Sequence, residues 1–231
     1  MEANSSSSFK IILGSASVAR RKILAEMGYE FTVMTADIDE KCIRKEKPEE
    51  LVLVLAQAKV WSSFPFLIFL SIKNLKLKIL LMETSQAEAN SQRLPVGDYI
   101  KDDEPTLLIT SDQVVVYEGV IREKPSSKEE AQQFLKDYSG GHAATVGSVH
   151  VTNLKTGFSK GEWDRVEIYF HEIPDEIIEK LIEEGTVLKV AGGLIIEHPL
   201  ILPFVKEVVG TTDSVMGLPK DLTRRLLKEA I

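Results

Sequence analysis

Asp112 is a carboxylate set between two apolar runs, in the stretch TLLITSDQVVVY (106–117). Apolar runs of this length favour buried strands, and a buried carboxylate is costly unless cations or hydrogen-bond donors meet it. Near the end of a strand, such a group can bind a divalent metal or orient a water molecule. Lys124 follows a hairpin predicted around Glu118 and Gly119, so it can fold back toward Asp112. These residues leave two interpretations open, a catalytic carboxylate or a structural Asp–Lys pair.

A second group of polar residues lies in GSASVARRKIL (14–24), where a predicted strand turns into a helix. Ser15 and Ser17 stand at the turn, and Arg20 and Arg21 follow one helical turn later. Hydroxyls, free backbone N–H groups and the helix dipole favour phosphate at such a turn, and a guanidinium adds bidentate contacts. The alternative is that the two arginines only form a solvated face of the helix.

Glu197 is a third candidate, an acid in the apolar stretch VAGGLIIEHP (190–199). The glycines of this stretch and of VVGTTDSVMGLP (208–219) indicate close approach of the backbone to another group. No Ser/His/Asp arrangement is evident. The four histidines are expected to be structural: His142, His150, His171 and His198.

The composition is that of a soluble globular protein, with 231 residues, 44% of them hydrophobic and 27% charged. The formal net charge of −7 argues against nucleic-acid binding, because phosphate backbones need a basic face. A small phosphorylated ligand stays possible. The single cysteine, Cys42, cannot form a disulfide within the chain, so we expect a reducing compartment, the cytoplasm. Without clustered His or Cys residues, zinc is not expected.

Two segments stand apart from the globular pattern. Residues 1–8 predict a disordered tail that lacks the features of a signal or transit peptide. Residues 60–86 are strongly apolar, but Lys73, Lys76 and Lys78 interrupt them, so we expect no membrane span.

Periodicity and capping signals predict an α/β fold in one domain over residues 9–231. The expected strands lie within 9–15, 31–39, 106–111, 114–125 (as a hairpin), 144–154 and 164–173. The expected helices lie within 16–31, from Pro48 to Lys59, and within 126–141, 174–185 and 218–231.

Taken together, the residues resemble the Maf family of nucleoside triphosphate pyrophosphatases. Eight motifs occur in family order over nearly the whole chain: SASVARRKIL (15–24), DIDE (37–40), AQAK (56–59), SDQVVV (111–116), EKP (123–125), YSG (138–140), AGG (191–193) and VMGLP (215–219). The resemblance implies an elongated mixed sheet flanked by helices with a central cleft, as in inosine triphosphatases. It also implies Mg²⁺- or Mn²⁺-dependent hydrolysis of a nucleoside triphosphate to monophosphate and pyrophosphate, and a homodimer.

The resemblance implies a role for each motif residue. Ser15 and Arg20 would hold phosphates, and Lys59 and Lys124 would neutralise the triphosphate. Asp112 would activate water, directly or through the metal, and Glu40 would help to hold that metal. Charge neutralisation and a positioned water are what phosphoryl transfer chiefly needs.

Three positions resemble the family branch that acts on 7-methyl-GTP. The first is Asp112-Gln113, where the dTTP/UTP branch has Asp-Thr. The second is Glu197, where that branch has Gln. The third is Arg20, which follows Ala19, whereas in that branch the arginines begin one position earlier. A carboxylate suits a 7-methylguanine base, because N1–H and the exocyclic amine are donors and methylation makes the ring cationic. Glu197 is therefore expected to contact the base.

Two other functions stay open. An inosine-type triphosphatase is one, although such enzymes open with a Thr/Ser-Asn and lysine pattern that SASVARR lacks. A nucleotide-binding regulator with weak or lost catalysis is the other, and a pyrophosphate-release assay separates it from the enzyme.

Residues 60–86 are the main departure from the family pattern. Deleting them yields AQAKAEAN, the continuous helix pattern of the family, and their ends fit the codons of a retained in-frame intron or an alternative splice form. Because they follow Lys59 directly, we expect them to interrupt the helix there.

We predict that a chain without residues 60–86 is more soluble, melts at a higher temperature and hydrolyses nucleotide faster than the full chain. The segment shows no single helical or strand period, so its apolar side chains cannot all be buried, and exposed apolar runs favour aggregation. Solubility, melting temperature and pyrophosphate release of the two chains check this. Equal values would make the segment a packed native element.

Overall fold

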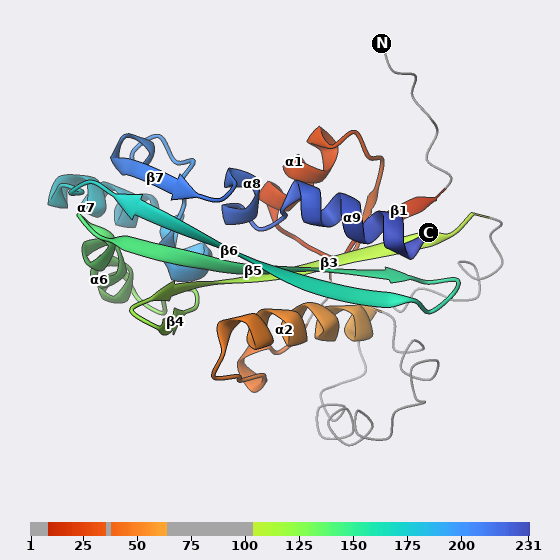
Figure 1. Cartoon of the computed structure of the whole chain (residues 1–231). Helices are drawn as coiled ribbons and strands as arrows, with labels where there is room; N and C mark the ends of the chain where they lie inside the picture. Colours follow the sequence, from red (N-terminus) through yellow and green to blue (C-terminus); the bar gives the residue numbers. More distant parts are fainter. Residues whose placement is uncertain (1–8, 36–37, 64–103) are drawn as a thin grey trace, which may run out of the picture.

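The computed structural model describes residues 9–35, 38–63 and 104–231. Its centre is a seven-stranded mixed sheet in the order β2-β1-β3-β5-β6-β7, with β4 paired to β3 (Figure 1). Bounds of the strands are β1 Lys10–Leu13, β2 Thr32–Val33, β3 Thr106–Tyr117, β4 Val120–Arg122, β5 His142–Asn153, β6 Ser159–Phe170 and β7 Val205–Val209. This mixed α/β sheet confirms the expected fold class.

Three long antiparallel strands form the backbone of the sheet. β3, β5 and β6 each have 12 residues, and β3 pairs with β5 from Leu107↔Asn153 to Val116↔Ala144. β1 is short and runs parallel to β3, as β2 does to β1. The second expected strand, 31–39, was too long, because only Thr32 and Val33 pair.

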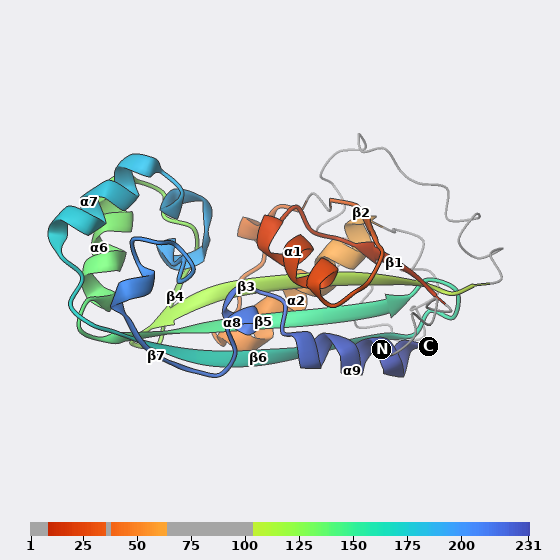
Figure 2. The same cartoon turned by 90° about the horizontal axis from the view of Figure 1, so that it is seen from above.

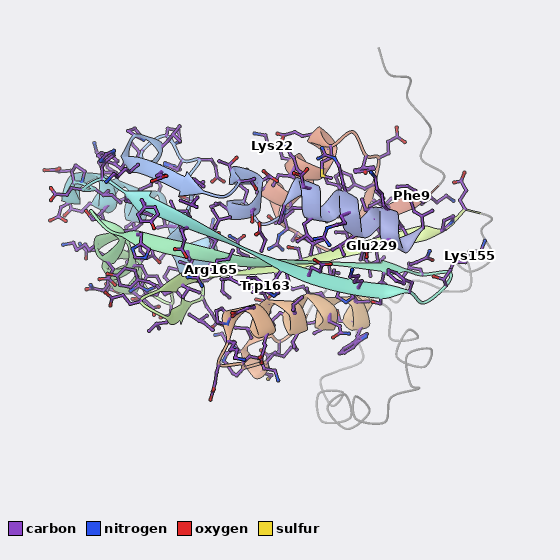
Figure 3. All side chains as sticks on the ribbon, viewed as in Figure 1. Phe9, Lys22, Lys155, Trp163, Arg165 and Glu229 are labelled. Atoms are coloured by element: carbon purple, nitrogen blue, oxygen red, sulfur yellow. The ribbon has the colours of Figure 1, made fainter. Side chains whose placement is uncertain are left out.

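Helices cover both faces and one end of this sheet. Viewed in Figures 1 and 2, α1, α8 and α9 lie on one face, α2 lies on the other, and α6 and α7 lie at one end. Lys22 of α1 and Glu229 of α9 mark the first of these layers in Figure 3. The helix bounds are α1 Val18–Glu26, α2 Pro48–Ser63, α6 Lys128–Tyr138, α7 Asp175–Glu184, α8 Thr212–Val215 and α9 Lys220–Ala230. Short 3-10 turns occur at Glu40–Cys42 (η1), Val187–Lys189 (η2), Ala191–Gly193 (η3) and Leu202–Phe204 (η4).

Alternation along β3 assigns its side chains to the two faces. Leu107 and Ile109 pack with α1 and α9, whereas Val114 and Val116 pack with Leu51 and Leu55 of α2. Burying each such side chain stabilises the fold by roughly 1.5–3 kcal/mol. Asp112 shares the parity of Val114, so β3 directs it toward α2.

Local signals explain the helix ends that the sequence predicts. Ser127 caps α6, with its side chain accepting a hydrogen bond from the Glu130 N–H. Gly28 ends the α1 region with a φ of +83°, and Gly185 closes α7 in the left-handed region. The hairpin turn at Glu118 and Gly119 is also present, with both residues at positive φ.

The expected end of α2 at Lys59 was wrong. The helix continues to Ser63, and Val60 is only 2% exposed. Val60 packs with Ile12, Leu108 and Leu154, and this apolar contact explains why the helix does not stop earlier. The remaining part of the suspected insertion, 64–86, and the tail 1–8 lie outside the described residues.

One edge of β3 has a gap in its strand pairing. β1 pairs with residues 106–109 of β3 and β4 pairs with residues 115–117, while β5 occupies the other edge. Among the described strands, residues 110–114 therefore have no partner on the first edge. Asp112 lies in the middle of this gap segment.

The described helices include none that is long and apolar enough to cross a bilayer.

His150 is a buried histidine in the centre of β5. It is 5% exposed, and its Nδ1 lies 3.5 Å from the Thr152 hydroxyl. Gly161 of β6 pairs with it, and a Cβ at that glycine would lie only 2.5 Å from the imidazole Cδ2. Burial lowers the pKa of His150 to about 4 from its ordinary 6.5. Burial in this close packing disfavours the charged form of the ring.

We predict that His150 makes the fold less stable in acid. Above pH 6.5 the ring is neutral in both states, and between pH 6.5 and about 4 only the unfolded chain takes up the proton. Urea unfolding at pH 7.5 and at pH 4.5 gives the free energy of unfolding at each pH. Between these two pH values, the wild type should lose about 2–3 kcal/mol more of this free energy than His150→Gln does. His142→Gln, at an exposed ring, is the control. Equal losses in wild type and His150→Gln would contradict the prediction.

Candidate functional site

Lys59 joins two carboxylates at the gap in β3. Its Nζ lies 2.5 Å from Asp112 Oδ1 and 3.0 Å from Glu40 Oε1. The lysine and Asp112 side chains are 11% and 9% exposed, whereas that of Glu40 is 43% exposed. Two carboxylates and an ammonium from three separate segments therefore meet at one partly solvent-facing point.

Two side-chain to backbone hydrogen bonds fix the position of α2 beneath the sheet. Thr110 Oγ1 donates to the Ala56 carbonyl at 2.7 Å, and Ser148 Oγ donates to the Val52 carbonyl at 2.7 Å. Both hydroxyls lie close to Asp112, because Thr110 precedes it by two residues on β3 and Ser148 of β5 is its pairing partner. Because Lys59 follows Ala56 by about one helical turn, this register brings its side chain to Asp112.

Arg20 reaches the same gap from the other face of the sheet. Ser17 caps α1 by accepting from the Arg20 N–H, which sets the arginine in the first turn. The guanidinium Nη1 donates to the Ser15 hydroxyl at 3.3 Å and to the Ser111 carbonyl at 2.9 Å. Lys59 Nζ also lies 3.5 Å from that carbonyl. Cations from both faces thus meet the backbone of the gap segment.

The loop before α9 completes the anchoring of Arg20. The Gly217 carbonyl accepts from Arg20 Nε at 3.0 Å and from the Ser111 hydroxyl at 2.8 Å. Gly217 has a φ of +94°, and a Cβ there would lie 2.5 Å from Gln113 Oε1. The sequence points to close backbone approach at this glycine, but it does not identify Ser111 and Gly217 as the partners of Arg20.

Burial and charge act in opposite directions on the ionisable groups. Burial raises the pKa of Asp112 above its ordinary value, and the charges of Lys59 and Arg20 only partly offset this. Burial also raises the pKa of Glu40, but Lys59, Lys124 and Arg20 outweigh it, so the net shift is downward. Desolvation lowers the pKa of Arg20, against the attraction of the two carboxylates. Asp112 is therefore the more basic of the two carboxylates.

Lys124 is exposed and lies just after β4. It helps to lower the pKa of Glu40, so it belongs to the electrostatic surroundings of the cluster. Three cations, Arg20, Lys59 and Lys124, then face two carboxylates. This excess of positive charge suits an anionic ligand with several phosphates.

Glu197 lies apart from this cluster. It is exposed in a turn after η3, beside the buried Ile196, and among the described residues it forms no hydrogen bond or ion pair with the other candidates. The structure thus brings together five of the candidates, places Lys124 within electrostatic reach of Glu40, and does not bring Glu197 into contact. The five are Ser15, Arg20, Glu40, Lys59 and Asp112.

Oxygen donors of the kind that Mg²⁺ and Mn²⁺ prefer are present at the cluster. Glu40 and Asp112 converge on one Nζ, so their oxygens point to a common region. No group of three or more His, Cys, Asp or Glu side chains with metal-binding spacing occurs in the described part of the chain. Two carboxylates still fit Mg²⁺, which commonly takes one or two from the protein and further oxygens from phosphates.

Comparisons with other proteins show the family to which the chain belongs. A family model described as Maf-like protein matches residues 10–230. A 7-methyl-GTP pyrophosphatase of Dictyostelium discoideum is 35% identical over 219 residues, covering 95% of this chain and 96% of the relative. A dTTP/UTP pyrophosphatase of Clostridium acetobutylicum is 28% identical, covering 94% of this chain and 96% of the relative. Another, of Alkaliphilus metalliredigens, is 27% identical, covering 91% and 90%.

Proposed function

Because the chain belongs to the Maf-like protein family, we propose that it is a nucleoside triphosphate pyrophosphatase that works with Mg²⁺ or Mn²⁺. The observation that carries this proposal is the meeting of Arg20, Lys59, Glu40 and Asp112 at the gap in β3. Such a group can neutralise a triphosphate and hold a carboxylate beside the reacting bond. The products would be a nucleoside monophosphate and pyrophosphate.

The roles of the residues follow from charge and position. Arg20 and Lys59, with Lys124 nearby, would neutralise the phosphate oxygens, and Ser15 would donate a hydrogen bond to one of them. Asp112 would accept the proton of a water molecule as its oxygen bonds to the α-phosphorus, and the bond to the bridging oxygen would break with pyrophosphate leaving. A divalent cation held by Glu40 and Asp112 would supply further charge neutralisation when bound.

The raised pKa of Asp112 suits the role of base. A carboxylate whose neutral form is favoured by burial takes up a proton more readily than an exposed aspartate does. The charges of Lys59 and Arg20 act in the opposite direction on the pKa of Asp112 and favour the ionised form that this role needs.

For the base, 7-methylguanine is the favoured choice. The relative with 35% identity is named a 7-methyl-GTP pyrophosphatase, and Asp112-Gln113 and Glu197 resemble that branch. Glu197 is exposed, so its carboxylate is accessible to a ligand. dTTP or UTP is the second candidate substrate, because relatives at 27% and 28% identity carry those names. A homodimer and a cytoplasmic location are further parts of this proposal, taken from the resemblance and from the single cysteine.

We predict that Asp112→Asn lowers kcat by about 10²–10⁴-fold, because the amide cannot accept the proton. Nucleotide should still bind, since Arg20 and Lys59 remain. Pyrophosphate release and equilibrium binding measure the two effects, with a circular dichroism spectrum to check folding. Asp221→Asn, the same chemical change at a side chain that is 97% exposed on α9, is the control. Near-wild-type turnover of Asp112→Asn would remove this residue from the mechanism.

We predict that Glu197 selects the base. Glu197→Gln should lower the ratio of kcat/KM for 7-methyl-GTP to kcat/KM for UTP by about tenfold, since an amide offers one acceptor oxygen and no negative charge. Glu207→Gln, at an exposed position of β7, serves as the comparison. If the ratio is the same in all three proteins, Glu197 does not choose the base.

A further inference from the structure

We propose that Arg44 and Glu123 are positioning residues that hold the η1 turn, with Glu40, against the strand end that carries Lys124. Arg44 Nη1 lies 3.2 Å from Glu123 Oε1, and we name this contact the Arg44–Glu123 clasp. The inference rests on the proposed function, because it concerns the place of two groups in the same phosphate site.

Arg44 ties the clasp to the backbone of the η1 turn. The same Nη1 donates to the carbonyl of Glu40 at 3.1 Å and to that of Ile43 at 2.9 Å. Asp39 braces the start of the turn by accepting from the Lys41 N–H. A displacement of Arg44 would therefore move the backbone of Glu40, whose side chain pairs with Lys59.

Glu123 ties the clasp to two other parts of the site. It directly precedes Lys124, so its position sets where that lysine leaves β4. Its carbonyl accepts from the Gly192 N–H at 2.8 Å, and the Gly192 carbonyl accepts from the Tyr138 hydroxyl at 2.9 Å. A Cβ at Gly192 would lie 2.5 Å from Val115 Cβ, so this glycine turn is packed against β3. Glu197 follows the same turn.

The clasp contributes little to the free energy of unfolding. The Arg44 and Glu123 side chains are 54% and 45% exposed, and exposed ion pairs contribute roughly 0–1 kcal/mol. The two residues are 79 positions apart, so the contact does not stabilise a local turn. What it determines is the spacing between two segments that carry opposite charges of the site. That spacing decides how well Glu40 and Lys124 face one triphosphate together.

Kinetics of three variants test the clasp. Arg44→Gln should raise KM for 7-methyl-GTP about five- to tenfold, with kcat changed less than threefold, because Asp112 and Lys59 stay in place. The double variant Arg44→Gln with Glu123→Gln should have about the same KM as Arg44→Gln, because a contact that is already broken cannot be lost a second time. Lys47→Gln breaks an equally long exposed pair, Lys47–Glu50 at 3.2 Å, and should leave KM unchanged.

Two further measurements separate positioning from folding and from metal binding. The melting temperature of Arg44→Gln should stay within about 2 °C of wild type. The affinity for 7-methyl-GTP measured in EDTA should also fall, because the position of Lys124 affects binding without turnover or metal. If Arg44→Gln equals wild type in KM and in metal-free affinity, the clasp does not position the site.

The outcomes distinguish this inference from the function on which it rests. Failure of the wild-type chain to release pyrophosphate from any triphosphate would overturn the proposed function, and the clasp with it. An active wild type with an unaffected Arg44→Gln overturns the clasp alone. A double variant whose KM is far above that of Arg44→Gln would also overturn it, because Glu123 would then act apart from its contact with Arg44.

Discussion

The buried ion pair between Lys59 and Asp112 is the interaction on which the centre of this structure depends. Neither side chain is more than 11% exposed, so each charge without the other would cost several kcal/mol of desolvation. The pair does not fully compensate Asp112, whose pKa stays raised by burial. A carboxylate held in this state is stabilised further by a cation, and a buried lysine by an anion. These charges favour the metal–triphosphate ligand that we propose for the site.

The fold delivers this pair through the pairing pattern of β3. β5 pairs with residues 107–116 along one edge of β3. On the other edge, β1 and β4 pair with the two ends of the strand, so residues 110–114 have no partner there among the described strands. Arg20 and Lys59 approach the Ser111 carbonyl in this gap from opposite faces. The missing strand contact is thus replaced by charged side chains. A regular ladder would have closed the position that we propose for the phosphates.

Local signals account for what the sequence predicts well. The Ser127 cap, the positive-φ glycines at 28 and 185 and the apolar runs on either side of Asp112 each act within a few residues, and the expected helices are present. The expected strand end just before Asp112 was wrong, because β3 continues without a break from Thr106 to Tyr117. The meeting of Lys59 with Asp112 could be expected only from the resemblance. It depends on the register between α2 and β3, which Thr110 and Ala56 set across 54 positions of the chain.

Contacts between distant segments account for what the sequence could not show. The hydrogen bond from Arg20 to the Gly217 carbonyl joins residues 197 positions apart, and the Arg44–Glu123 clasp joins residues 79 positions apart. Neither has a periodic or spacing signal, because the partners come from different layers. The end of α2 was misjudged for a related reason. Lys59 is polar and resembles a helix end, but its charge is satisfied by Asp112 and Glu40, so the helix can bury it and continue.

The anchoring of α2 also bears on the unusual segment that follows it. The hydrogen bonds that set its register, to the carbonyls of Val52 and Ala56, both lie before Lys59. The apolar contacts of Leu51 and Leu55 lie before it as well, and together these interactions stabilise the helix position by several kcal/mol. Val60 adds one contact after it. The hydrogen bonds that place Lys59 therefore lie on its N-terminal side, and residues 60–86, the suspected insertion, do not supply them.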